Sequence, residues 1–379
     1  MKKYWIKFSI RLLVSFVVTA PNGMIGAEKL TESDARILLQ KLQMATENSA
    51  VSGIYNVQEQ LRDGEKNTGW QIYVWPDNRA VYKFIPAADD SAAPLIIRDG
   101  DDLFFKSSDG DSRRGLKRRF HHWYHNQRLF IDPELLAQNY TFETEVGPEY
   151  LGRATQSLII SSAYEGRMAV AMLFDREIKF IYRTDINIPS KSGKQLSRSQ
   201  FWQNVDHSIP DSTIFFEAKK GTKIFKKRKQ VPTHFSNLTE FLAEHDGNFL
   251  LPKHLPTGFK LHMIRRLDRN DNKILHFLYT DGLSTISMFQ ESHGKESQRS
   301  GKRKPKALLS FVNGEFEGLR FRLMSELSRA ELLKIEKSLF VVKRQDKNPF
   351  LLSMAGIALI IMLNIIFWIW YAKRNSLHF

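Results

Sequence analysis

The fold is decided by a stretch at residues 70–85, WQIYVWPDNRAVYKFI. Apolar and aromatic side chains fill the two runs on either side of Pro76, Asp77 and Asn78, and these three residue types favour turns. Two such runs joined by a short turn predict an antiparallel hairpin, with one strand at 70–75 and the next at 80–85.

Further short apolar runs continue the pattern on both sides of this hairpin. They lie at 51–57, 95–97, 103–105, 140–146, 154–161, 168–174 and 179–186, with turn-forming residues between them. One helix is expected before them, at 31–45, with Thr31 or Ser33 as its cap and an apolar stripe on one face. A shorter helix is expected at 133–138, with Asp132 as N-cap before Pro133. The predicted fold class is therefore α+β, a half-open antiparallel β-barrel wrapped on a helix, over residues 28–190.

A second, smaller sheet-plus-helix domain is predicted at 250–342. It begins with a proline-braced segment at 251–259, followed by strands at 260–266, 274–279 and 285–289. A hairpin is expected between 307–312 and 318–324, with Asn313-Gly314 as its turn. A capping box from Ser328 to Glu331 begins the closing helix. Residues 191–249, rich in Lys, Ser and Gln, are expected to form an end strand and then a basic linker with a short helix at 238–243.

Both ends of the chain carry apolar segments. Residues 1–27 combine a basic start, a short apolar run and small residues, which is the pattern of a secretory signal peptide; an uncleaved anchor is the alternative. The run Phe350–Tyr371 contains no Asp, Glu, Lys or Arg and is predicted to be one C-terminal transmembrane helix, with a buried core helix as the alternative. We therefore expect a single-pass protein of the inner (cytoplasmic) membrane, with its bulk in the periplasm and a cytoplasmic tail at 372–379.

Composition limits the classes of function. The chain has a net charge of +15 and no cysteine, so thiolate catalysis and cysteine metal sites are excluded. A basic surface favours acidic partners such as anionic lipids or acidic protein segments. Nucleic acid is not expected as a partner, because the predicted compartment is extracytoplasmic.

Two basic clusters are the candidate sites for a protein partner or anionic lipid. The histidines of HHWYH at 121–125 leave a metal site as an alternative to a cationic, aromatic surface, but no carboxylate accompanies them. We find no phosphate-binding loop, nucleophile elbow or zinc-protease motif, and we expect neither an enzyme nor a cofactor. The candidate binding residues are Arg113, Arg114, Lys117, Arg118, Arg119, Lys302, Arg303 and Lys304.

Two segments of the second domain carry distinctive short motifs, Leu255-Pro-Thr-Gly-Phe259 and Leu278-Tyr-Thr-Asp-Gly-Leu-Ser-Thr-Ile-Ser287. They resemble the pattern "LP-x-GF … YSDGL-x-x-FSV" of the MucB/RseB family, periplasmic regulators of the envelope-stress sigma factor. In the first domain, residues 140–185 resemble its "Y-x-F … G … R … D" meander. The resemblance covers most of residues 30–340 in short motifs.

This resemblance implies a LolA-like first domain whose concave face accepts lipid or lipoprotein acyl chains. It also implies a second domain that helps to bind the periplasmic domain of an anti-sigma factor and to shield it from proteolysis. Family members used for comparison are soluble, so the run at 350–371 points to a tethered relative. A lipid or lipoprotein chaperone without an anti-sigma partner remains the alternative hypothesis, and an envelope hydrolase is a weaker one.

Overall fold

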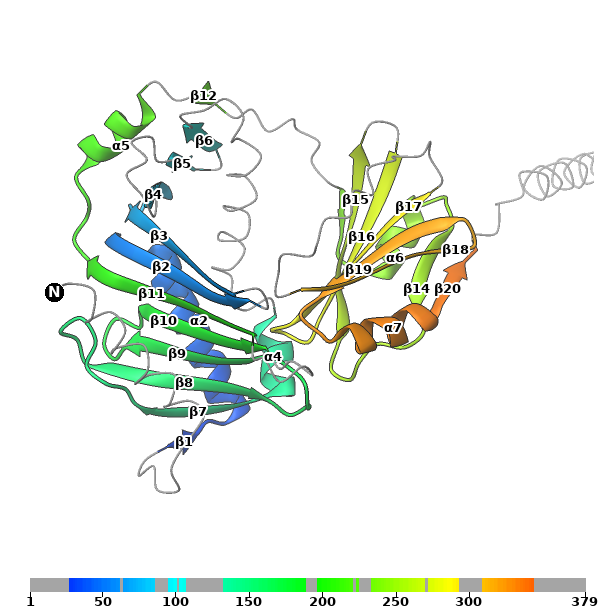
Figure 1. Cartoon of the computed structure of the whole chain (residues 1–379), viewed down its shortest axis with the longest axis horizontal. Helices are drawn as coiled ribbons and strands as arrows, with labels where there is room; N and C mark the ends of the chain where they lie inside the picture. Colours follow the sequence, from blue (N-terminus) through cyan, green and yellow to red (C-terminus); the bar gives the residue numbers. More distant parts are fainter. Residues whose placement is uncertain are drawn as a thin grey trace, which may run out of the picture.

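The structure, a computed structural model, describes residues 27–61, 64–85, 95–100, 102–106, 132–188, 196–220, 223–224, 233–269, 272–292 and 309–343. In these ranges the chain is mostly antiparallel sheet with five helices. Two sheet domains lie side by side, joined where helix α4 of the first meets the strands of the second (Figure 1).

The first domain is built on one twelve-stranded antiparallel sheet. Its end strands β1 and β12 do not pair with each other, so the sheet is open. In pairing order the strands are β1 (Glu28–Lys29), β7 (Tyr140–Val146), β8 (Thr155–Ser162), β9 (Ala169–Asp175), β10 (Ile181–Ile188), β11 (Leu196–Asp206), β2 (Val51–Leu61), β3 (Gly64–Val74), β4 (Arg79–Ile85), β5 (Leu95–Asp99), β6 (Asp102–Lys106) and β12 (Lys223–Ile224).

Helix α2 (Glu32–Asn48) lies across one face of this sheet (Figure 1). The Thr31 hydroxyl caps it by accepting a hydrogen bond from the backbone N–H of Asp34, as the sequence predicts. Its buried side chains, Leu39 and Leu42 among them, pack against apolar residues of β7, β8, β9 and β10. Burial of this stripe, rather than helix propensity alone, therefore holds the helix on the sheet.

The same face of the sheet continues beyond α2 as a row of aromatic side chains. Directly paired residues of antiparallel strands point to the same side of a sheet. By this rule the register places four rings in line across β11, β2, β3 and β4. Two neighbouring pairs have ring centroids 5.2 and 5.3 Å apart in edge-to-face contact. The row consists of Trp202, Tyr55, Trp70 and Phe84.

Helix α5 (Ser212–Lys219) packs on the opposite face of the same sheet. Its Phe215 is buried against Trp75, Val81, Ile97 and Phe104. The first domain thus has apolar side chains on both faces of strands β3 to β6.

A buried polar cluster lies at the hairpin that joins β9 to β10. Asp175 accepts hydrogen bonds from the Arg153 guanidinium at 2.7 Å and from the Tyr182 hydroxyl at 3.1 Å. The hydroxyl oxygen of Tyr182 lies 3.1 Å from Nε2 of His207. Burial alone would raise the pKa of Asp175, but the Arg153 guanidinium and two backbone N–H groups outweigh it and lower that pKa to about 2. We interpret this cluster as structural, because the carboxylate fixes the turn.

The second domain has a six-stranded antiparallel sheet with a small two-stranded sheet beside it. In pairing order the larger sheet contains β13 (Thr233–Phe235), β15 (Lys260–Arg269), β16 (Asn272–Thr280), β17 (Thr285–Ser292), β19 (Leu319–Ser325) and β18 (Ser310–Phe316). The smaller one pairs β14 (Phe249–Pro252) with β20 (Leu339–Val342). Helices α6 (Leu238–Glu244) and α7 (Arg329–Lys337), with β14 and β20, pack into one core on one face of the larger sheet.

One predicted turn is wrong. Asn313-Gly314 lies inside β18, and the chain turns at Glu317-Gly318, where both residues have positive φ. Phe316 pairs with Leu319 across this two-residue turn. An Asn-Gly signal is local, whereas the register of β18 on β19 decides which Gly-containing pair turns.

The segment between the two expected domains contributes to both sheets. Strand β11 pairs with β10 on one side and with β2 on the other, so it lies inside the first sheet. Strand β13 pairs with β15 of the second sheet, and α6 forms close to the predicted residues. Little of 196–220 therefore serves as a connection.

The predicted fold class is wrong in its transmembrane helix. In the part of the chain that the structure describes, the longest helix is α2 with 17 residues, and no helix is both long and apolar enough to cross a membrane. The expected span Phe350–Tyr371 and residues 1–26 of the expected signal peptide lie outside the described residues.

Candidate functional site at the domain seam

The two domains meet at a seam, which we define by five segments. The first domain contributes α4 (Pro133–Asn139) with Tyr140, and Arg167 before β9. The second contributes the 255–259 segment, the 280–284 turn between β16 and β17, and the beginning of β15. Asp132 caps α4 by accepting from the backbone N–H of Leu135 at 3.0 Å, and Pro133 follows at the first position of the helix, as predicted.

Asn139, the last residue of α4, ties the helix to both second-domain segments. Its side-chain amide nitrogen lies 2.9 Å from the carbonyl oxygen of Leu135, 3.1 Å from that of Gly258 and 3.0 Å from that of Asp281. Asn139 is buried, so these bonds replace water that it would otherwise need. One side chain therefore connects backbone segments that lie more than a hundred residues apart.

Asp281 organises the facing turn. One carboxylate oxygen accepts from the backbone N–H groups of Leu283 at 3.1 Å and Ser284 at 2.7 Å. The other accepts from the Tyr140 hydroxyl at 3.0 Å. Burial, and then the charge of Asp281, raises the pKa of Tyr140, so this phenol stays protonated and donates. The carboxylate is 0% exposed and has donors on both sides.

Arg167 is the buried counter-charge of Asp281, and its geometry is loose. Its Nη1 lies 3.8 Å from a carboxylate oxygen of Asp281, and its side chain is 3% exposed. Nη2 donates to the carbonyl oxygen of Thr257 at 3.2 Å, and the guanidinium lies 4.6 Å above the Phe259 ring. Nε and Nη1 have no hydrogen-bond partner. The guanidinium therefore depends on Asp281 for charge balance.

The 281–284 turn enters the core of the first domain. Leu283 is 6% exposed and belongs to the apolar cluster that contains α2, although it comes from the second domain. Gly282 has a φ of +105°, and a Cβ there would lie 2.3 Å from the backbone nitrogen of Leu136. A Cβ at Gly258, φ +87°, would lie 2.6 Å from the amide oxygen of Asn139. Only glycine permits the close approach of Gly282 to the Leu136 backbone and of Gly258 to the Asn139 side chain.

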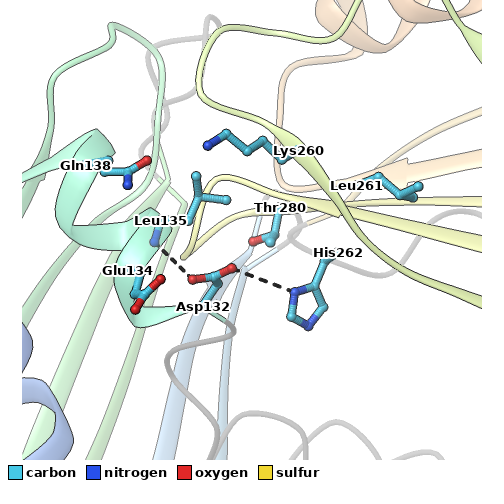
Figure 2. A pocket seen from close by; sticks show the side chains of 8 residues that line it. All are labelled: Asp132, Glu134, Leu135, Gln138, Lys260, Leu261, His262 and Thr280. Atoms are coloured by element: carbon cyan, nitrogen blue, oxygen red, sulfur yellow. Dashed lines mark hydrogen bonds and ion pairs between the residues drawn. The ribbon is translucent and has the colours of Figure 1, made fainter. Parts of the chain in front are cut away.

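A pocket of about 250 Å³ opens at the seam (Figure 2). Acidic side chains come from the α4 side and basic ones from β15, and Nδ1 of His262 lies 4.0 Å from a carboxylate oxygen of Asp132 across it. Both domains thus contribute to one small, mostly polar hollow. Its lining consists of Asp132, Glu134, Leu135, Gln138, Lys260, Leu261, His262 and Thr280.

The strand that forms one wall of the pocket has a partly free edge. Strand β13 pairs with β15 only at Ile264–Arg266. Along Lys260–Met263, no strand of the described residues pairs with that edge. The register with β16 shifts between Leu261 and Met263, which is a bulge at His262. Unpaired edges accept an added strand, and bulges re-aim side chains, so the seam offers backbone groups beside the pocket.

The residues that the sequence singled out as binding candidates are not in the seam. Both basic clusters, at 113–119 and 302–304, lie outside the described residues, as do the histidines at 121–125. Within the described ranges, no group of three or more metal-ligating His, Asp or Glu side chains occurs. The seam itself was missed as a site. Its only sequence signal was the pair of motifs at 255–259 and 278–287, which carried the family resemblance.

Comparison with known proteins confirms that resemblance at the level of the fold. The crystal structure of MucB in complex with MucA(peri) matches with a TM-score of 0.55 and 15% identity, covering 82% of this chain and 100% of that chain. A Pseudomonas aeruginosa MucA/MucB complex matches with a TM-score of 0.53 and 14% identity over 82% and 100% of the two chains. A LolA superfamily protein from Nitrosomonas europaea covers 48% of this chain and 96% of its own, with a TM-score of 0.23 and 10% identity.

No family model matches the sequence, and no curated protein does. At 14–15% identity, the solved structures establish a shared architecture and leave the activity to be argued from the site. The chain has the two-domain fold of MucB.

Proposed function

We propose that this chain is a periplasmic regulator that binds the periplasmic segment of an anti-sigma factor at the seam. The observation that carries the proposal is that residues of both domains build one pocket beside a free strand edge. Two of the matching structures hold MucB together with MucA, so this fold accommodates such a partner in other proteins.

The chemistry of the pocket fits a peptide better than a small apolar ligand. Its carboxylates and its Lys260 and His262 offer charges of both signs, and the unpaired backbone at 260–263 offers main-chain hydrogen bonds. An extended peptide uses such main-chain bonds for affinity and side-chain pockets for specificity. A partner in this position touches both domains at once, so its affinity depends on an intact seam.

Titration of the full chain with the periplasmic segment of an anti-sigma factor from the same cell tests this function. Gln138→Trp fills the exposed mouth of the pocket and is expected to weaken binding by about tenfold or more. Gln138→Ala is the matched control at the same position, and Lys83→Trp adds the same ring on an exposed part of β4. Equal affinities for all three variants would exclude the pocket as the binding site.

The aromatic row of the first sheet favours a second candidate function, the binding of lipid or lipoprotein acyl chains. Four rings in register across four strands form one apolar face, on which Trp202 and Trp70 are buried and Tyr55 and Phe84 are partly buried. Organic extraction of the purified chain, followed by mass spectrometry, tests it. Recovery of stoichiometric acyl lipid that is lost with Trp70→Ser supports this function, and a lipid-free protein contradicts it.

A further inference from the structure

The larger sheet of the second domain has one covered face and one open face. Helices α6 and α7 and strands β14 and β20 all contribute to the core on its inner face. Figure 1 shows α6, β14 and β20 on the side of β15 and β16 that is farther from the first domain. At its Thr280 end, the outer face meets α4 of the first domain at the seam pocket. In the described ranges, the core clusters place no helix over the centre of this face, at His276 and Phe289.

A row of large side chains crosses this outer face in register. Arg265 of β15 pairs with His276 of β16, which pairs with Phe289 of β17, which pairs with Arg322 of β19. The rings of His276 and Phe289 are stacked, with centroids 4.2 Å apart and planes within 8°. Two guanidinium groups therefore flank one flat pair of rings. On the far side of Arg265, His234 of β13 extends the row.

The cations of this row have no carboxylate partner among the described residues. Nε of Arg265 donates to the sulfur of Met263 at 3.1 Å, and a thioether is a weak acceptor. Nε of Arg322 donates to the neutral amide oxygen of Asn313 at 2.8 Å. The acid–base pair on this face, Glu315 with Arg320 at 3.6 Å, lies one row further along the strands.

Burial disfavours the charged forms of three members of this row. Burial lowers the pKa of Arg265. Burial, and then the charge of Arg265, lowers the pKa of His276 to about 4 and also lowers that of His234. Nε2 of His276 is buried without a hydrogen-bond partner. Arg265 is half-buried without an anion, which costs free energy, whereas Arg322 is exposed. An acidic group from outside would therefore complete the row at Arg265 and would find a second, solvent-exposed cation at Arg322.

The spacing of the row defines what kind of partner completes it. Arg265 and Arg322 are three strand spacings apart, which is about 14 Å. In an extended chain, side chains at i and i+4 point the same way and are also about 14 Å apart. The side chain at i+2 then lies between them, above the stacked rings, whereas a single phosphate is too small to reach both guanidiniums.

We propose that this outer face binds an extended acidic protein segment, with carboxylates at i and i+4 on Arg265 and Arg322 and an apolar or aromatic side chain at i+2 on His276 and Phe289. The surface is separate from the seam pocket. On β16, Thr280 of the pocket and His276 are four residues, about 14 Å, apart. Binding at this outer face can therefore be tested independently of binding at the seam.

Fluorescence anisotropy with short labelled peptides tests the proposal on the full chain. The matched probe is a threonine-rich peptide of about nine residues with Glu at i and i+4 and Tyr at i+2; its twin carries the second Glu at i+3, on the other face. The matched peptide is expected to bind about tenfold more tightly than its twin. Arg265→Met and Arg322→Met are each expected to weaken it about tenfold. Arg329→Met, an exposed change of equal charge on α7, is expected to have no effect.

Three outcomes would overturn the proposal. Equal affinity for the two peptides, or an equal loss with Arg329→Met, would show non-specific attraction to a basic protein. Binding of phosphatidylglycerol vesicles through the same two arginines, without binding of the matched peptide, would assign the face to lipid headgroups. Saturation by inorganic phosphate with the same dependence on arginine would assign it to a small anion.

Stability gives an independent readout that a structural role of Arg265 would not reproduce. Because this cation is half-buried and unpaired, Arg265→Met is expected to leave Tm unchanged or to raise it while it weakens peptide binding. A clear fall in Tm together with unchanged binding would make Arg265 a structural residue and contradict the proposal.

Discussion

Arg167 and Asp281 form a buried ion pair at the seam. Removing the anion and removing the cation are expected to cost different amounts of stability, and this difference tests the seam. At 3.8 Å and an effective dielectric constant of about 20, the attraction between the two charges is about 4 kcal/mol. Asp281→Asn keeps an oxygen for the N–H groups of Leu283 and Ser284 but leaves the Arg167 guanidinium buried without an anion. Such a loss costs about 3–5 kcal/mol of the free energy of unfolding.

The reverse change is expected to cost much less. Arg167→Met removes the cation together with its desolvation cost, and Asp281 keeps the hydroxyl of Tyr140 and two backbone N–H groups as donors. We expect Arg167→Met to lower the free energy of unfolding by about 1–2 kcal/mol. The double variant Arg167→Met/Asp281→Asn should lose nearly the same amount, because it leaves no unpaired guanidinium buried. The coupling between the two positions is therefore expected to be about as large as the cost of Asp281→Asn, about 3–5 kcal/mol.

Urea unfolding of the full chain, followed by circular dichroism, measures these differences as a double-mutant cycle. The pair of Lys343 and Glu317 is a suitable control, since its atoms lie 3.7 Å apart but its side chains are 74% and 50% exposed. Glu317→Gln is expected to cost less than about 1 kcal/mol. A cost for Arg167→Met as large as that for Asp281→Asn, or simple addition of the two effects, would contradict the coupling between these two charges.

Three further predictions concern single positions. Gly282→Ala drives a Cβ into the backbone of Leu136 and is expected to separate the domains, seen as a larger radius of gyration in small-angle scattering; Gly318→Ala, with positive φ but open space, should leave the radius unchanged. Leu283→Ala should lower the free energy of unfolding by about 2–5 kcal/mol, and a loss below about 1 kcal/mol would show that the side chain is not held in the first-domain core. The pKa of Asp175 is lower in the folded state, so its stabilisation is complete above about pH 4 and is lost as the pH falls toward 2; Asp175→Asn should flatten that part of the stability profile, which an unchanged slope would contradict.

Local rules in the sequence predicted the helix starts well. Thr31, Asp132 and Ser328 each cap a helix through the predicted contact, because capping depends on residues within one turn. The turn of the last hairpin was not predictable in this way, since Asn313-Gly314 and Glu317-Gly318 both permit positive φ and pairing with β19 decides between them.

The seam was beyond sequence reasoning for a different physical reason. Asn139 and Asp281 are ordinary polar residues in the sequence, and their role follows from the meeting of segments 142 positions apart. Leu283 looks like part of a strand–turn motif, yet it packs in the core of the other domain. The basic clusters drew attention because charge is visible in sequence, whereas burial of a polar side chain is not.

The absence of cysteine from the whole chain makes one measurement especially direct. A single cysteine at Gln138, in the pocket, carries a photo-activated cross-linker, and a second protein with the cysteine at Lys83 serves as the control. Irradiation in membranes, followed by mass spectrometry, is predicted to join the periplasmic segment of an anti-sigma factor to position 138 and not to position 83. Only acyl lipid at position 138, or the same products from both positions, would contradict a protein-binding seam.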